Sequence, residues 1–153
     1  MGEKNTDELE RTLKTTHPED YDKFRDSNKE SFLLDKGSFS EYMKEILNRN
    51  KMLLQTVFLE ADIPERYGYK LLSEEKHTKQ RDVILRICYA GKLTLDETQR
   101  ALRIYKMAEL YAKDKRDALI MICFNERPGT ILDVNAYLKE YGMQPLRSSG
   151  LQD

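Results

Sequence analysis

Several residue types are scarce in this sequence of 153 residues, and each scarcity narrows the classes of protein it fits. With 7 Gly, 4 Pro and no Trp, it is neither collagenous nor of low complexity. Lys and Arg total 26 against 27 Asp and Glu, so the chain lacks the strong basicity of many nucleic-acid binders. Charged residues make up 35% and hydrophobic residues 39%, which is typical of a helical globular protein.

The sequence also lacks a long apolar run and a secretory signal. No stretch approaches the roughly 18 apolar residues of a membrane span, and residues 1–14 are charged throughout. We therefore expect a cytoplasmic protein without a membrane partner. Cys88 and Cys123 lie in apolar runs, where a thiol usually packs as a small hydrophobic group rather than forming a disulfide.

Groups for catalysis are few. The chain has two histidines, His17 beside a proline and His77 in a polar stretch, and both fit solvated loop positions. No Gly-rich phosphate loop and no Cys or His pair at zinc spacing is present. We predict no enzymatic activity, no cofactor and no metal site.

Helix start signals recur along the chain. A capping residue stands three positions before a carboxylate, the capping-box spacing, at Asn5/Glu8, Thr16/Glu19, Ser38/Glu41, Asp62/Glu65 and Thr94/Glu97. We predict helices over 6–15, 18–28, 39–49, 52–61, 64–73, 79–90, 95–105, 115–125 and 131–141. The apolar run 118–124 also fits a buried strand, but Asp114 as a cap favours a helix. The predicted class is all-α.

The balanced total charge hides an uneven distribution. Residues 1–37 carry 7 basic and 10 acidic side chains, a net charge of −3. Residues 78–107 carry 7 basic and 3 acidic side chains, a net charge of +4. The near-zero total therefore does not exclude a local basic surface.

The second half of the chain repeats itself. Residues 81–89 align with 116–124 at an offset of 35, including the Arg-Asp start and the Cys. After an insertion of one residue, the stretch from Leu95 aligns with the stretch from Ile131 at an offset of 36. Although two amphipathic hairpins can be aligned by chance, the shared Arg-Asp, Cys and Tyr favour a true repeat.

The segment 38–105 carries a family resemblance. Helix 52–61, a short turn at Asp62-Ile63 and a helix from Pro64 are followed by two more helices. Apolar residues stand at Val57, Ala61, Ile63 and Leu71. The start of the last of these helices has the sequence Leu93-Thr94-Leu95-Asp96-Glu97. This segment resembles the five-helix DNA-binding domain of lambda-repressor-like, XRE-type helix-turn-helix regulators. Departures from that family stand at Leu53, Leu54, Phe58, Asp62 and Gly68.

The resemblance implies a role for helix 64–73 as the recognition helix in the major groove of double-stranded DNA. Ile63, Tyr67 and Leu71 would then face the core. The base-contacting candidates are Arg66, Glu65, Tyr69 and Lys70, and the phosphate-contacting candidates are Gln55, Lys76, His77, Lys79 and Arg81. Arg66 is the strongest of these, because a guanidinium can make two hydrogen bonds to guanine.

An alternative exists for Arg81, which occupies the same place in the repeat as Arg116. Each precedes an Asp, which also suits a structural ion pair at a helix start. Whether Arg81 contacts phosphate stays open at the level of sequence.

Four segments follow from these observations. We predict an N-terminal helical arm (1–37), the helix-turn-helix domain (38–107), a C-terminal helical hairpin that repeats 79–107 (108–146) and a disordered tail (147–153). The expected function is sequence-specific DNA binding in transcriptional regulation, as a homodimer. The alternative is a protein-interaction module on a helix-turn-helix scaffold, and the C-terminal hairpin is a further candidate surface for a protein partner.

Overall fold

A computed structural model describes residues 38–148, and its secondary structure over this range is helical, which confirms the all-α prediction there. The helices are α4 (Phe39–Arg49), α5 (Leu54–Ala61), α6 (Glu65–Leu72), α7 (Arg81–Ala90), α8 (Leu95–Ile104), α9 (Lys115–Glu126) and α10 (Ile131–Glu140). The arm 1–37 with its two predicted helices, and the tail beyond residue 148, lie outside the described residues. Within residues 38–148, no helix is long and apolar enough to cross a membrane.

Helix boundaries agree with the predicted ranges to within two residues, and α8 and α9 begin at side-chain caps. The predicted capping box at Thr94 is confirmed: its hydroxyl accepts from the Glu97 N–H at 3.1 Å, and the Glu97 carboxylate accepts from the Thr94 N–H at 2.9 Å. Asp114 caps α9 by accepting from the Asp117 N–H at 2.9 Å. The run 118–124 is therefore part of a helix, as predicted, and the Asp114 cap stabilises the start of that helix.

The predicted capping box of Asp62 with Glu65 is wrong. Asp62 instead ends α5 in the left-handed conformation, with φ 56° and ψ 52°, and Pro64 is the N-cap of α6. In this conformation the N–H groups of Asp62 and Ile63 donate to the carbonyls of Leu59 and Phe58, each at 3.1 Å. Asp tolerates the left-handed region better than most residues, so it can occupy a turn position that usually favours Gly.

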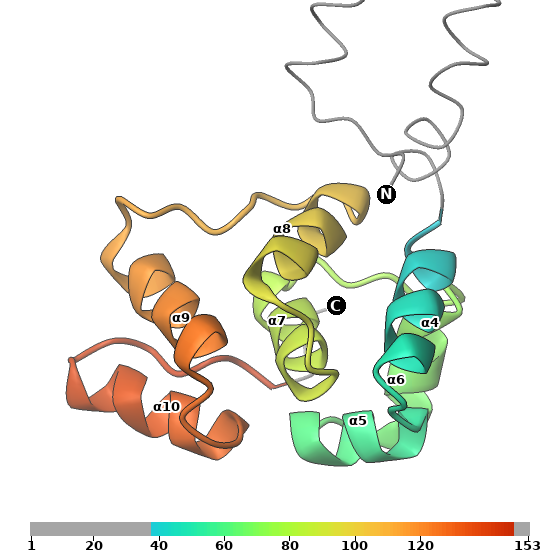
Figure 1. The fold of residues 1–153 in the computed structure, drawn as a ribbon, viewed down its shortest axis with the longest axis horizontal. Helices are drawn as coiled ribbons and strands as arrows, with labels where there is room; N and C mark the ends of the chain where they lie inside the picture. Colours follow the sequence, from blue (N-terminus) through green and yellow to red (C-terminus); the bar gives the residue numbers. More distant parts are fainter. Residues whose placement is uncertain (1–37, 149–153) are drawn as a thin grey trace, which may run out of the picture. The chain divides into compact units, whose positions relative to one another are not determined.

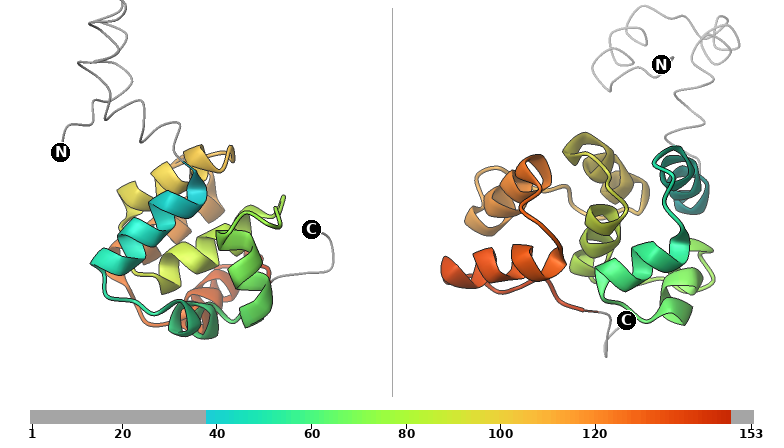
Figure 2. Two further views of the ribbon diagram at one scale, coloured as in Figure 1. Left: turned by 90° about the vertical axis from the view of Figure 1, so that its right-hand side faces the viewer. Right: turned by 60° about the horizontal axis from the view of Figure 1, so that its bottom comes forward.

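Helix α7 is the centre of the described core. All its residues from Asp82 to Ala90 are buried, and the helix contacts α5, α8 and α10. Helix α4 lies on one side of the α7–α8 hairpin and the α9–α10 hairpin lies on the other (Figure 1; Figure 2, right). Burial on all sides explains why α7 is apolar around most of its circumference.

The hairpins α7–α8 and α9–α10 meet through two reciprocal ion pairs. Arg81 at the start of α7 donates to Asp117 of α9 at 2.6 Å, and Arg116 of α9 donates to Asp82 of α7 at 2.9 Å. Exchange of residues 81 and 82 with 116 and 117 converts one pair into the other. The contact therefore has the self-complementary form of an interface between two copies of one unit.

The segments that follow the two hairpins repeat the same bonds. The N–H of Leu110 donates to the Gln99 side chain at 2.7 Å, and the N–H of Leu146 donates to the Asn135 side chain at 2.7 Å. The further equivalent pairs are Tyr111 N–H with Asp117 and Arg147 N–H with Asp82, each at 2.9 Å. Donors and acceptors thus correspond at the sequence offsets of 35 and 36.

Arg86 breaks this equivalence. Its buried guanidinium donates to the carbonyls of Ala61 at 2.9 Å, Leu146 at 2.7 Å and Arg147 at 2.9 Å. Burial lowers its pKa, and the charges of Asp62 and Asp82 oppose that effect. The residue at the same place in α9 is Met121, which has no such donors. Arg86 thereby ties the end of α5 to the segment after α10.

Candidate nucleic-acid interface

The geometry of α5 and α6 depends on a close contact between Phe58 and Gly68. A Cβ placed on Gly68 would lie 2.4 Å from the Phe58 ring, so only glycine fits at this position of α6 without movement of its neighbours. These residues are two of the departures from the helix-turn-helix family, one larger and one smaller than usual. They compensate each other, because the ring fills the space that a side chain at position 68 would occupy.

The predicted core residues of this region differ in burial. Ile63 and Leu71 are buried as predicted, whereas Tyr67 is half-buried. The Tyr67 hydroxyl is buried and has no hydrogen-bond partner within residues 38–148. The Lys76 Nζ lies over the Tyr67 ring, 5.1 Å from the ring centroid.

The predicted base-contacting residues divide into exposed and partly covered ones. Glu65, Arg66 and Tyr69 are exposed, and Lys70 is half-buried. Arg66 stands in the first turn of α6 and has no hydrogen bond or ion pair to any described residue. Tyr69 packs edge-on against Phe58 with ring centroids 5.0 Å apart, which limits the rotation of its ring. Glu65 and Arg66 are therefore the most available of the four side chains, and of these two Arg66 carries the positive charge.

The predicted phosphate-contacting residues also differ in their surroundings. Gln55 and Lys79 are exposed and have no side-chain partner within the described residues. Lys76 is exposed above Tyr67, and His77 stacks on the ring of Tyr105 with centroids 4.2 Å apart. Lys76, His77 and Lys79 follow α6 directly. They do not form a continuous basic stripe with Lys70, because Glu74 and Glu75 are exposed in the intervening stretch.

Arg81 is partly buried and held by several hydrogen bonds. Besides the bond to Asp117, its guanidinium donates to the carbonyls of Ala108 at 3.4 Å and Glu109 at 3.3 Å. A phosphate at Arg81 would have to compete with this carboxylate. The structural pair that the sequence suggested for Arg81 is present, but its partner is the Asp of the other hairpin rather than the neighbouring Asp82.

Much of the positive charge of segment 78–107 is internal. Arg86 and Arg100 are buried, Arg81 is paired with Asp117, and Arg103 lies 3.7 Å from Glu109. The exposed basic residues of this segment without an ion-pair partner in the described structure are Lys79, Lys92 and Lys106. The net charge of +4 therefore overstates the basic surface that a polyanion would meet.

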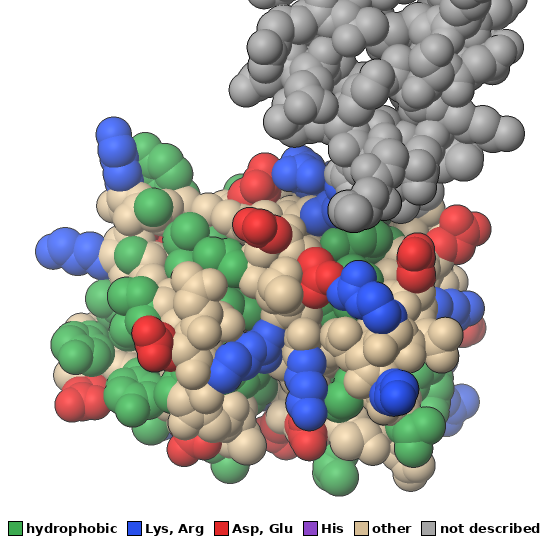
Figure 3. Space-filling model, viewed as in Figure 1, with side chains coloured by type: hydrophobic (Ala, Val, Ile, Leu, Met, Phe, Trp, Pro, Cys, Tyr) green, Lys and Arg blue, Asp and Glu red, His purple; other side chains and the backbone are tan. Residues whose placement is uncertain are grey.

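Helix α5 presents apolar side chains to solvent. Leu59 is 78% exposed, and Leu53, the residue before the helix, is 73% exposed. The face of the molecule drawn in Figure 3 carries side chains of both charges mixed with hydrophobic ones. Leu53 and Leu59 cannot bind phosphate, but their exposed side chains suit an apolar contact with another protein.

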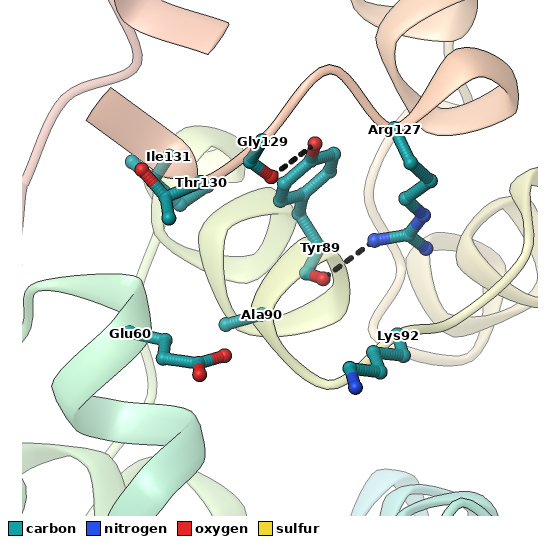
Figure 4. Close-up of a pocket in the computed structure, with 8 residues that line it drawn as sticks. All are labelled: Glu60, Tyr89, Ala90, Lys92, Arg127, Gly129, Thr130 and Ile131. Carbon is teal, nitrogen blue, oxygen red and sulfur yellow. Dashed lines mark hydrogen bonds between the residues drawn. The ribbon is translucent and has the colours of Figure 1, made fainter. Parts of the chain in front are cut away.

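A pocket of about 440 Å³ lies between α5, α7 and the loop before α10. The Tyr89 hydroxyl donates to the Gly129 carbonyl at 2.8 Å, and Arg127 donates to the Tyr89 carbonyl at 2.7 Å (Figure 4). Arg127 also donates to the Leu93 carbonyl. The Arg127 guanidinium also lies 4.5 Å from the Tyr89 ring centroid. Because these polar groups bond to one another, we interpret the pocket wall as a joint between the hairpins.

Both cysteines of the described residues are buried and free. Burial raises the pKa of the Cys88 thiol to about 12, so it is not a reactive thiolate. Burial likewise raises the pKa of Cys123. No cluster of His, Cys, Asp and Glu within residues 38–148 has the arrangement of a metal site.

Two features escaped prediction from the sequence. The reciprocal ion pairs had a signal in the Arg-Asp dipeptide that recurs at an offset of 35, but the dipeptide itself does not say which Asp each Arg binds. The Arg127 cluster had no signal, because it joins a helix end to carbonyl groups more than 30 residues away. Comparison of the chain with protein-family models, curated proteins and solved structures found no match.

Proposed function

We propose that the protein binds double-stranded DNA through α6, with Arg66 as the principal base-reading residue. The observation that carries the proposal is the free, exposed guanidinium of Arg66 in the first turn of a helix that follows a tight turn. Residues at the start of a recognition helix are those that reach base edges in helix-turn-helix proteins. A bidentate contact with guanine contributes roughly 1–3 kcal/mol of sequence discrimination.

Backbone contacts would come from the side chains around α6. Gln55 at the start of α5 can donate to a phosphate, and Lys70, Lys76 and Lys79 supply positive charge. Glu65, with Glu74 and Glu75, opposes them, so affinity for random DNA should be low. Binding as a homodimer would double the number of contacts and place two copies of α6 in successive major grooves.

The test is binding to a random pool of DNA duplexes, followed by enrichment of the bound sequences. With Arg66 and three lysines near phosphates, the affinity of each protomer should fall roughly 100-fold between about 50 and 200 mM salt. Arg66→Ala should abolish the preference among enriched sequences, whereas Lys139→Ala, which removes an exposed charge on α10, should leave it unchanged. Undetectable duplex binding at low salt, or an unchanged preference in Arg66→Ala, would contradict the proposal.

A second candidate function is protein binding through the same scaffold, and the exposure of Leu53 and Leu59 favours it. In that case a photo-reactive residue in place of Leu59 should crosslink to a defined protein in cell extract. The same residue in place of Lys139 should not give this product. Crosslinking from both positions alike would argue against a specific surface on α5.

A further inference from the structure

The two hairpins differ in the exposure of equivalent residues on their outer faces. Three positions that are buried in α7–α8 are open in α9–α10. The pairs are Ile87 (0% exposed) with Ile122 (54%), Ala101 (0%) with Tyr137 (42%) and Tyr105 (5%) with Tyr141 (63%). Hydrophobic side chains accordingly gather at the left of Figure 3, over α9 and α10. Among residues 38–148, one hairpin thus has a cover that the other lacks.

The cover on the first hairpin comes from two helices, because α4 packs on α8 and α5 packs along α7. The Phe39 ring packs edge-on against Tyr105, with centroids 4.7 Å apart, and the side chain of Leu47 lies against Gly91. The carboxyl end of α4 is anchored by charge, because Arg49 forms an ion pair with the carboxylate of Glu97. The part of the cover that lies on α8 is therefore an amphipathic helix with a basic residue at its end.

The second hairpin retains the corresponding anchor. Asp133 stands at the position of Glu97, and its Oδ2 accepts from the Thr130 N–H at 2.8 Å, as the Oε1 of Glu97 accepts from the Thr94 N–H. The other oxygen of Glu97 binds Arg49. The other oxygen of Asp133, Oδ1, has no partner within residues 38–148. On α9–α10, exposed apolar side chains and an available carboxylate thus stand at positions whose equivalents in α7–α8 are buried or paired.

We propose that the outer face of α9–α10, formed by Ile122, Tyr137 and Tyr141 beside Asp133, docks an amphipathic helix of a partner protein. The helix would resemble α4, with apolar residues placed like Phe39, Met43, Ile46 and Leu47 and a basic residue placed like Arg49. Docking of an apolar helix face into a groove is a common mode of recognition. The proposal does not depend on DNA binding by α6.

A second copy of this chain is a poorer occupant. The four apolar side chains of α4 are buried within their own chain, so a folded copy has no α4 to offer. Two α9–α10 faces in contact would each present an Asp133 carboxylate and no equivalent of Arg49. The charge of the anchor therefore favours a separate helix with a basic end.

The test uses the full chain and a labelled synthetic peptide with the sequence of residues 38–51, whose binding is followed by fluorescence anisotropy. The peptide should bind saturably, and Ile122→Asp should weaken binding at least about ten-fold, as expected for loss of a central apolar contact. Leu132→Asp is the matched control, because Leu132 is 70% exposed on the same hairpin but corresponds to Asp96 in α8. Circular dichroism would establish that both variants are folded.

The proposed ion pair between the basic end of the docked helix and Asp133 provides a second test. A peptide with Arg49→Glu should bind roughly three- to ten-fold more weakly to the unaltered chain, and Asp133→Asn should remove most of that difference. Failure of the peptide to bind, or equal weakening by Ile122→Asp and Leu132→Asp, would overturn the proposal. Self-association of the chain that Ile122→Asp abolishes would assign the face to a second copy instead.

Discussion

The hairpins α7–α8 and α9–α10 have equivalent internal bonds and different surroundings. Each begins with an Arg-Asp pair that binds the other hairpin, and each has an amide side chain, Gln99 or Asn135, that holds the following segment. Yet the outer face of the first is buried by other helices, and the outer face of the second is open. The comparison teaches that the hairpin fold depends on its own bonds, whereas the role of its outer face depends on what lies against it.

The largest effect should come from truncation of equivalent isoleucines. Ile87→Ala leaves a cavity in a fully buried site and should lower the free energy of unfolding by about 2–5 kcal/mol. Ile122→Ala removes a half-exposed side chain and should change it by about 0.5 kcal/mol. Urea unfolding followed by circular dichroism measures both. Equal losses would show that Ile122 is covered in solution and would remove the contrast between the hairpins.

An intermediate effect is expected from the reciprocal ion pairs. Asp117→Asn and Asp82→Asn each remove the charge opposite a partly buried Arg and should each lower the free energy of unfolding by about 2 kcal/mol. Because the two networks are equivalent, the losses should agree within about 0.5 kcal/mol.

The control is Glu140→Gln, which removes an exposed carboxylate from α10 and should have little effect. Urea midpoints at constant slope give the comparison. A loss confined to one of the two Asp variants would break the equivalence of the hairpins.

The smallest effect concerns the anchoring carboxylates. Burial alone would raise the pKa of Glu97, but the hydrogen bond from Thr94, with the hydrogen bond and charge of Arg49, outweighs burial, so its pKa lies below the usual value. A depressed pKa in the folded state means that the ionised form stabilises the fold. That contribution is present above the unfolded pKa, about 4.3, and is lost as pH falls through the lower folded value.

Glu97→Gln should therefore lower the free energy of unfolding by roughly 1 kcal/mol at neutral pH, a small effect because water screens the exposed Arg49. The difference from the unaltered chain should shrink as pH falls below about 4. Asp133→Asn should cost less, since Asp133 has no cation within the described residues. Unfolding curves at several pH values decide this, and a difference that grows in acid would be the opposite result.

Predictability from the sequence varied with the range of the interactions. The starts of α8 and α9 were predictable because the caps Thr94 with Glu97 and Asp114 with Asp117 act over three residues. The starts of α5, α6 and α7 have no side-chain cap, so their prediction rested on the apolar pattern. The Asp62 start signal failed because the same residue type also suits a left-handed turn, and local spacing does not separate the two uses. For the candidate site, exposure of Arg66 agrees with its predicted role, whereas the environment of Arg81 depends on Asp117, 36 residues away.

The sequence by itself determined where the helices of the described region lie and which positions of the two hairpins correspond, because capping and helical periodicity depend on residues a few positions apart. Only the tertiary structure decided that Arg81 binds Asp117, that Phe58 fills the space beside Gly68, and that Tyr105 is buried while Tyr141 is exposed. The physical reason is that burial and charge pairing depend on segments brought together by folding, so equivalent residues in a repeat can have different environments.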